Sequence, residues 1–173
     1  WDGPIVVEGY EELLVDELEI ESTDPLCFEA VDGTITVPMS AVSGGAGAYK
    51  FTLLEMVGEG EGGAWVALED YTELALGEFT GLPAGVYAVL VEDAEDCPSY
   101  TTEPIELVDP AELAFTTDFW HFSCEDSNDG IIRLNVTGGT GNYWYAINNQ
   151  NLWVAFGNEI ATKTYIATEP GTF

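Results

Sequence analysis

The sequence predicts an all-β protein made of tandem immunoglobulin-like antiparallel β-sandwich domains, the second incomplete at its C-terminal strand. Short stretches in which apolar and polar residues alternate occur along the chain, and this period of two is typical of strands with one buried face. A long internal repeat divides the 173 residues into one full copy and most of a second. A copy of roughly 95 residues has room for five to seven short strands, as in an immunoglobulin-like domain.

The repeat is carried by residues that return in the same order. Cys27 and Asp32 recur as Cys124 and Asp129, each aspartate followed by glycine, at an offset of 97 (124 minus 27). A period of nearly 100 residues is too long for a solenoid unit and fits tandem domains, each with its own core. The later matches pair residues 43–51 with 137–145, 65–68 with 153–156, and 83–87 with 169–173.

The same matches set the expected domain boundaries. Residues 1–12 are expected to be the tail of a preceding copy or a linker, because Pro4-Ile5-Val6-Val7 matches the segment that begins at Pro104. The first sandwich is expected over 13–109 and the second, truncated one over 110–173.

The strands are expected in the following order. Residues 11–18 have helical spacing and propensity, but their counterpart in the second copy contains a proline and two threonines. A linker that runs into a first strand is therefore favoured, with a helix as the alternative. Glycine pairs at 44–45 and 138–139 and the Pro-Ala-Gly at 83–85 supply turns. Alternation predicts strands over 34–41, 49–53, 87–91 and 132–136, and the recurring tryptophans at 65 and 153 are expected in the cores.

The charge balance excludes several partners. The chain has 32 acidic residues against three Lys or Arg, a net charge of −29. Nucleic acids, phosphate ligands and anionic membranes are held by Lys and Arg, so none is expected as a partner. No apolar run reaches the roughly 18 residues of a membrane span, so no membrane insertion is expected.

Catalytic residue patterns are scarce. The only histidine is His121, within Phe-Trp-His-Phe, and it is expected to be an ordinary surface histidine because no nucleophile is paired with it by spacing. Residues 58–63 form an acidic glycine loop that would repel phosphate. An enzyme is therefore the least expected class, with no catalytic residue assigned. The three cysteines lack the paired spacing of a zinc or redox site and suggest an oxidising, extracellular environment.

Two interpretations of the acidity remain open. One is a solvated surface that favours solubility or suits salty surroundings. The other is calcium bound in loops, where carboxylates and carbonyls converge. No cofactor is required, and calcium is the one that the sequence suggests, although the spacing fits no calcium-loop motif. The candidate ligands are Asp93, Glu95 and Asp96 in one loop, and Glu125, Asp126, Asn128 and Asp129 in another.

Two further sites are candidates. Trp144 alternates with Tyr143 and Tyr145, so its ring is expected to face outward, either as a platform for a sugar or as a contact with a neighbouring strand or domain. The missing last strand of the second copy would leave backbone groups unpaired. The segment Pro4, Ile5, Val6 and Val7 of an identical subunit is a candidate to cover them by strand addition.

These elements together resemble the SprB repeat of Bacteroidota surface adhesins. The resemblance rests on Cys27, on the Asp-Gly pair at 32–33, on Tyr49, on the Leu-Pro-Ala-Gly-Val-Tyr at 82–87 and on the segment 91–97 that ends in Cys97. It covers about 13–109 and most of 113–173. It implies a large secreted cell-surface protein exported by the type IX system, with roles in adhesion and gliding motility.

The resemblance also suggests a disulfide between Cys27 and Cys97. Such a bond is expected to join the ends of one sandwich, and closing about 70 residues would stabilise the fold by roughly 4 kcal/mol. The partner of Cys124 would then lie outside this chain.

Three function hypotheses follow. The first is a non-enzymatic stalk segment of an extracellular adhesin, which has neighbouring repeats of the same protein as partners. The second is a subunit of an extracellular filament, joined to identical subunits by strand complementation. The third is a carbohydrate-binding module for surface glycans.

Overall fold

The computed structural model describes residues 9–58, 63–95, 98–124, 129–141 and 143–146, and the backbone of strands 154–157 and 162–167. Backbone contacts divide the chain into two compact units, the first of Trp1–Pro25 and Glu29–Asp109 and the second of Leu26–Phe28 and Pro110–Phe173. The strand pairings described are all antiparallel, and no α-helix occurs in the described part. The prediction of an all-β fold is confirmed. None of the described residues forms a helix long and apolar enough to cross a membrane.

One sheet of the first unit has three strands in the order β2 (Glu21–Thr23), β3 (Gly33–Val37) and β7 (Gly77–Leu82). Strand β3 lies at the centre, and its residues alternate between buried and half-buried. This alternation is the predicted one, because successive side chains of a strand point to opposite faces. One face of β3 therefore contributes to the core and the other lies toward solvent.

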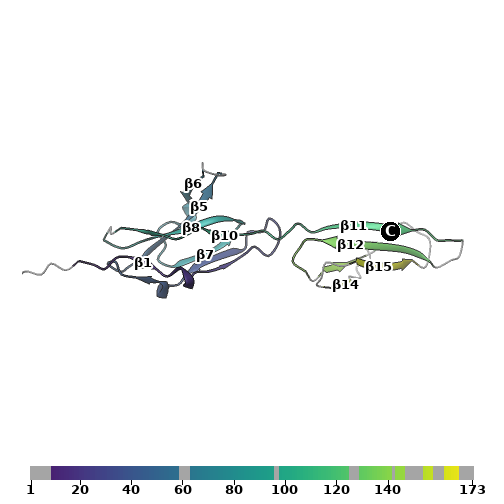
Figure 1. Cartoon of the computed structure of the whole chain (residues 1–173), viewed down its shortest axis with the longest axis horizontal. Coiled ribbons are helices and arrows are strands. Elements are labelled where there is room, and N and C mark those ends of the chain that lie inside the picture. The colour runs from purple at the N-terminus through teal and green to yellow at the C-terminus, as the bar shows by residue number, and fades with distance from the viewer. Residues whose placement is uncertain are drawn as a thin grey trace, which may run out of the picture. The chain divides into compact units, whose positions relative to one another are not determined.

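The other sheet of the first unit contains five strands (Figure 1). The order is β10-β8-β5-β6, and β9 pairs with β8 next to β10. The β5–β6 hairpin projects from the body of the unit (Figure 1). Its Trp65 is only half-buried and lies outside the core, so the expectation that recurrence places it in the core is wrong. The bounds are β5 Lys50–Val57, β6 Ala64–Ala67, β8 Gly85–Glu92, β9 Tyr100–Thr101 and β10 Ile105–Leu107.

The remaining elements of the first unit are short. Strand β1 (Leu14–Val15) pairs with β4 (Val42–Ser43), so residues 11–18 are a linker that runs into a strand, as favoured, followed by a short 3₁₀ turn and not an α-helix. The predicted strand over 34–41 ends at Val37, because Pro38 has no N–H for a ladder. The 3₁₀ turns are η1 (Glu17–Glu19), η2 (Met39–Ala41) and η4 (Glu69–Tyr71).

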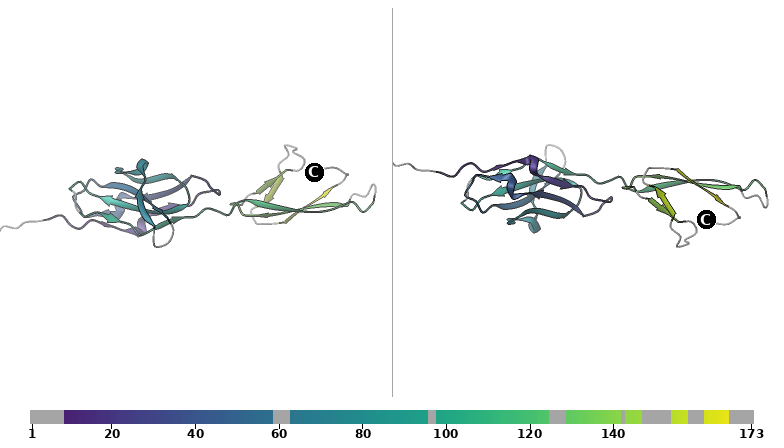
Figure 2. Two further views of the ribbon diagram at one scale, coloured as in Figure 1. Left: turned by 90° about the horizontal axis from the view of Figure 1, so that it is seen from above. Right: turned by 90° about the horizontal axis from the view of Figure 1, so that it is seen from below.

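The core of the first unit lies between its two sheets (Figure 2). Both sheets contribute side chains with no exposed surface, and each buried Val, Leu, Ile or Phe side chain stabilises the fold by about 1.5 to 3 kcal/mol. The arrangement is consistent with a β-sandwich, while its immunoglobulin-like type stays a prediction. The largest fully buried residues are Ile35, Val37, Phe51, Leu53, Phe79, Leu82, Tyr87, Val89 and Val91.

The second unit has a three-stranded sheet and a separate strand pair (Figures 1 and 2). The sheet order is β11 (Ala114–Trp120), β12 (Gly130–Thr137) and β15 (Thr162–Ala167), and β13 (Tyr143–Tyr145) pairs with β14 (Val154–Gly157). In the described part, this unit contains no counterpart of β8, β9 or β10.

The two units share the register of their first two strands. In the first unit Glu21 pairs with Thr36 and Thr23 with Thr34. In the second, the residues 97 positions later form the same pairs between β11 and β12: Asp118 with Arg133, and Trp120 with Ile131. The sequence repeat is therefore also a structural repeat.

Candidate functional sites

The repeated glycine pair forms the same tight turn in both units. At Gly44 (φ +76°) a Cβ would lie 1.9 Å from the Glu12 carbonyl oxygen, and at Gly138 (φ +72°) it would lie 1.9 Å from that of Glu112. Only glycine fits so close to a backbone at positive φ. The recurrence of this motif therefore has a structural cause.

A tyrosine closes each turn. The Tyr49 hydroxyl donates a hydrogen bond of 2.6 Å to the Gly44 carbonyl, and the Tyr143 hydroxyl donates to the Gly138 carbonyl. The Gly45 N–H donates to the Glu11 carbonyl at 2.8 Å. These bonds attach the turn to the segment that enters the sandwich.

Asp93, a candidate calcium ligand, is buried beside the first of these turns. Asp93 is only 5% exposed. The Ala46 N–H donates to Oδ2 at 2.8 Å and the Glu95 N–H donates to Oδ1 at 3.0 Å. Both carboxylate oxygens accept backbone hydrogen bonds, so Asp93 holds the glycine turn against the end of β8.

The other calcium candidates do not form a cluster in the described part. Glu95 is exposed, and Asp129 Oδ1 accepts from the Ser123 N–H at 3.1 Å. Asp96, Glu125, Asp126 and Asn128 lie outside the described residues. No group of three or more His, Cys, Asp or Glu residues that could hold a metal ion occurs among the residues described. Calcium binding stays a prediction.

Cys27 is exposed, in the loop between β2 and β3. Cys97 lies outside the described residues, so the Cys27–Cys97 bond stays a prediction. The loop that holds Cys27 is attached at the end of β10: the Val108 N–H donates to Asp24 Oδ1 at 2.8 Å, and the Glu29 N–H donates to Asp109 Oδ2 at 3.2 Å.

The described residues before Cys97 lie at the opposite end of the first sandwich. Gly85, the first residue of β8, pairs with Leu107 at the end that holds the Cys27 loop. Glu92, the last residue of β8, pairs with Lys50 at the other end. Eight strand residues span about 23 Å, whereas the Cα atoms of a disulfide lie within about 7 Å. The Cys27 loop and Glu92 are therefore farther apart than a disulfide spans, and the bond to Cys97 stays a prediction.

The single histidine is placed against an aromatic ring. His121 follows β11, and its ring meets that of Phe119 edge-to-face, with centroids 5.3 Å apart. No hydrogen bond from His121 to a serine or cysteine nucleophile is found in the described part of the chain. The geometry offers His121 no catalytic partner there.

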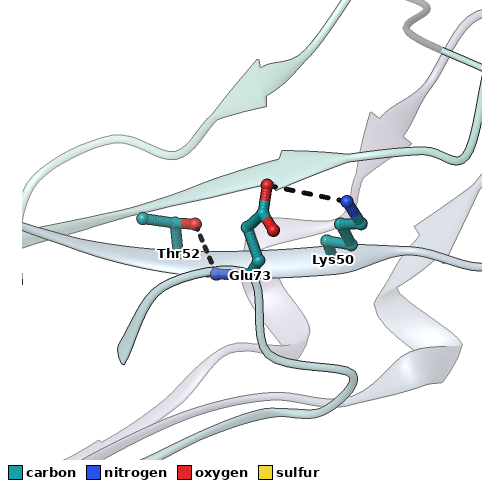
Figure 3. A network of polar contacts seen from close by, with 3 residues as sticks. All are labelled: Lys50, Thr52 and Glu73. Carbon is teal, nitrogen blue, oxygen red and sulfur yellow. Dashed lines mark hydrogen bonds and ion pairs between the residues drawn. The ribbon is translucent and has the colours of Figure 1, made fainter. Parts of the chain in front are cut away.

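The ion pair of the first unit fixes a loop over strand β5 (Figure 3). Lys50 Nζ lies 3.6 Å from Glu73 Oε1, and the Glu73 N–H donates to Thr52 Oγ1 at 3.0 Å. Thr52 lies on the face of β5 opposite the core residues Phe51 and Leu53, but this loop covers it and leaves it 4% exposed. The contacts of Glu73 with Lys50 and Thr52 therefore hold this loop against β5.

Two tyrosines have raised pKa values. Burial, and then the charge of Glu55, raises the pKa of Tyr87 to about 12, and its hydroxyl donates to the Pro83 carbonyl at 2.9 Å. The pKa of Tyr100 is raised by its hydrogen bond to Glu17. Both phenols therefore stay neutral at ordinary pH and serve as hydrogen-bond donors.

Trp144 is 61% exposed on β13, as its position in the alternation predicts, and its ligand role stays a proposal. The segment Pro4, Ile5, Val6 and Val7 lies outside the described residues.

Sequence reasoning missed one feature: Trp120 of β11, whose ring lies 4.8 Å from the guanidinium carbon of Arg133. The repeat did contain a signal for it: Thr23 stands at the equivalent position of the first copy, so the tryptophan is a departure from the repeat.

Comparison with known proteins agrees with this internal symmetry. The family model described as the SprB repeat matches residues 20–56 and 122–152. The first match runs from β2 through most of β5, and the second includes β12 and β13. Neither a curated protein nor a solved structure matches the chain. The resemblance to the SprB repeat is confirmed, once in each copy of the internal repeat.

Proposed function

We propose that this chain is a non-enzymatic stalk segment of a large extracellular repeat protein, exported by the type IX system, which acts in cell-surface adhesion or gliding. The match of the SprB repeat to both copies is the observation that carries the proposal. SprB repeats occur in cell-surface proteins related to gliding adhesins. The partners of this segment are the neighbouring repeats of the same protein.

The described side chains support a structural role. The polar groups of three buried residues, Asp93, Thr52 and Tyr87, bond to backbone atoms of the first unit. Each such bond holds a loop or turn, and none leaves a reactive group aimed into a cleft. A spacer needs a rigid fold and a soluble surface, and a net charge of −29 favours solubility.

A replacement experiment in the native host tests the stalk role. Residues 13–109 of the full protein are exchanged for an unrelated antiparallel β-sandwich of similar length, and in a matched strain they are deleted. If the repeat acts as a spacer, the exchanged protein is expected to support surface display and adhesion, and the deletion is expected to reduce adhesion. Loss of adhesion in the exchanged strain at normal surface display would show that the repeat itself acts in binding.

A filament subunit is the second candidate, favoured by one observation. Phe115 and Phe119 of β11 are 70% and 65% exposed, although they lie on the same sheet face as Ile132, which pairs with Phe119. In the first unit the equivalent of Phe119 is Ser22, a small polar residue that is also exposed, whereas the second unit places large aromatic rings there. A strand from an identical subunit would cover these rings by strand addition.

Sedimentation velocity over a hundredfold range of concentration tests this candidate. Strand exchange predicts growth of polymers with concentration and a monomer when Ile5 and Val7 are replaced by Asp. A monomer at every concentration for the unaltered chain would discard the filament and leave the stalk proposal intact.

A further inference from the structure

On the outer face of β11 and β12, one aromatic and three polar side chains lie in a row. Trp120 is 47% exposed and stacks on the guanidinium of Arg133, the residue diagonal to it across the strand pair. The next diagonal contact is parallel to it: Asn135 Nδ2 donates to Asp118 Oδ2 at 3.2 Å. Register places all four side chains on one face, because residues two apart in a strand share a face.

The fold itself does not require these residues. At the equivalent positions of the first unit stand Thr23 and Thr36, and Thr23 exchanges a hydrogen bond of 2.7 Å with Thr34. The first unit thus forms the same strand pair with small hydroxyl side chains. Trp120 and Arg133 are additions of the second copy, and an exposed tryptophan adds apolar surface that folding alone would avoid.

Arg133 retains unused hydrogen-bonding capacity. Among the described residues no carboxylate lies within ion-pair distance of its guanidinium. Its Nε is covered and has no hydrogen-bond partner there, so the donors left for a ligand are those of the terminal Nη groups. The charge of Arg133 is balanced by Asp118, its direct neighbour across the strands. The row is therefore locally neutral, within a chain whose net charge repels polyanions.

We propose that Trp120, Arg133 and Asp118 form a binding platform for a neutral polysaccharide. The exposed indole stacks against the C–H face of a pyranose ring. The guanidinium donates hydrogen bonds to sugar hydroxyl oxygens, and the Asp118 carboxylate accepts from sugar hydroxyls. A donor and an acceptor beside an aromatic ring match adjacent sugar hydroxyls. An acidic polysaccharide would instead be repelled by Asp118 and by the negative net charge of the chain. This platform is distinct from Trp144 and goes beyond the stalk role.

Native affinity electrophoresis of the full chain tests the platform, because the acidic protein migrates readily. The gels contain laminarin, xyloglucan or galactomannan as neutral probes, and alginate as the acidic probe. We expect at least one neutral polysaccharide to retard the chain. Trp120→Thr, which installs the residue of the first copy, is expected to weaken the apparent affinity at least about fivefold, as for loss of one aromatic contact. Trp144→Ala is the matched control and is expected to keep the affinity.

Further variants keep the proposal falsifiable if Trp120→Thr unfolds the second unit. Arg133→Lys retains the charge but loses the planar stack, and it is expected to weaken binding. Thr23→Trp combined with Thr36→Arg installs the platform in the first unit and is expected to increase retardation. The proposal is overturned if no neutral probe retards the chain, if alginate alone does so, or if folded Trp120→Thr binds as well as the unaltered chain. Retardation lost only in Trp144→Ala would also overturn it.

Discussion

Gly44 lies so close to Glu12 that a Cβ on Gly44 would fall 1.9 Å from the Glu12 carbonyl oxygen. Gly138 has the same relationship with Glu112 in the second unit. The contact brings the segment that enters each sandwich against the turn after its central strand. It explains, from backbone sterics, why glycine stands at this point of both copies.

Replacement of Gly44 by Ala is expected to destabilise the first unit by about 3 kcal/mol or more, because a positive φ and a backbone clash add together. Gly47 is the matched control: its φ is +75°, but nothing lies within 4 Å of a Cβ there. Gly47→Ala is expected to cost about 1 kcal/mol. Scanning calorimetry measures both, and equal shifts in Tm would refute the close approach.

Asp93→Ala is expected to destabilise the first unit by about 1 to 3 kcal/mol, because the N–H groups of Ala46 and Glu95 lose their acceptor. Glu95→Ala removes an exposed carboxylate of the same loop and is expected to change the unfolding free energy by less than about 0.5 kcal/mol. Urea denaturation with EDTA, and again with calcium, separates the two possible roles. An unfolding free energy of the unaltered chain that EDTA lowers beyond an ionic-strength control would instead establish a calcium site.

The fold and the sequence resemblance predict different outcomes for the cysteines. The resemblance predicts a Cys27–Cys97 bond, whereas the topology places Cys27 and Glu95 at opposite ends of the sandwich. From the fold we expect alkylation of Cys27 in the native, non-reduced chain. Non-reducing peptide mapping decides: a linked Cys27–Cys97 peptide from one chain would confirm the bond that the resemblance predicts, and full alkylation of Cys27 would contradict it.

The raised pKa of Tyr87 makes stability depend on alkaline pH. The phenol ionises near pH 10 in the unfolded chain but at about 12 in the folded one. Its contribution is therefore complete below pH 10 and is lost as the pH rises toward 12. Urea unfolding at pH 9, 10 and 11 is expected to show a decline that is less steep in Tyr87→Phe. The same slope in both proteins would contradict this burial of the hydroxyl.

Local patterns in the sequence predicted much of the first unit. The alternation around Ile35 and Val37 identified the central strand, since a period of two follows directly from strand geometry. It failed at Met39, which is 48% exposed, because Pro38 ends the ladder. It failed at Thr52 because a loop from a later part of the chain covers the second face of β5. Such coverage depends on tertiary contacts that a local period does not encode.

The functional residues were harder to predict for the same reason. Asp93 was one of many carboxylates, and its burial comes from the glycine turn 47 residues before it. Trp120 and Arg133 become notable only when the register pairs them on one face.

The intact mass of the native polypeptide that contains this sequence is the most direct test of the stalk proposal. Extracts of the native host, reduced and denatured, are separated by size, and peptides of residues 13–109 are located by mass spectrometry. A covalent repeat stalk predicts a polypeptide many times the 18.7 kDa of this chain. Recovery of these peptides from an 18.7 kDa polypeptide that forms non-covalent polymers under native conditions would contradict the stalk and establish the filament instead.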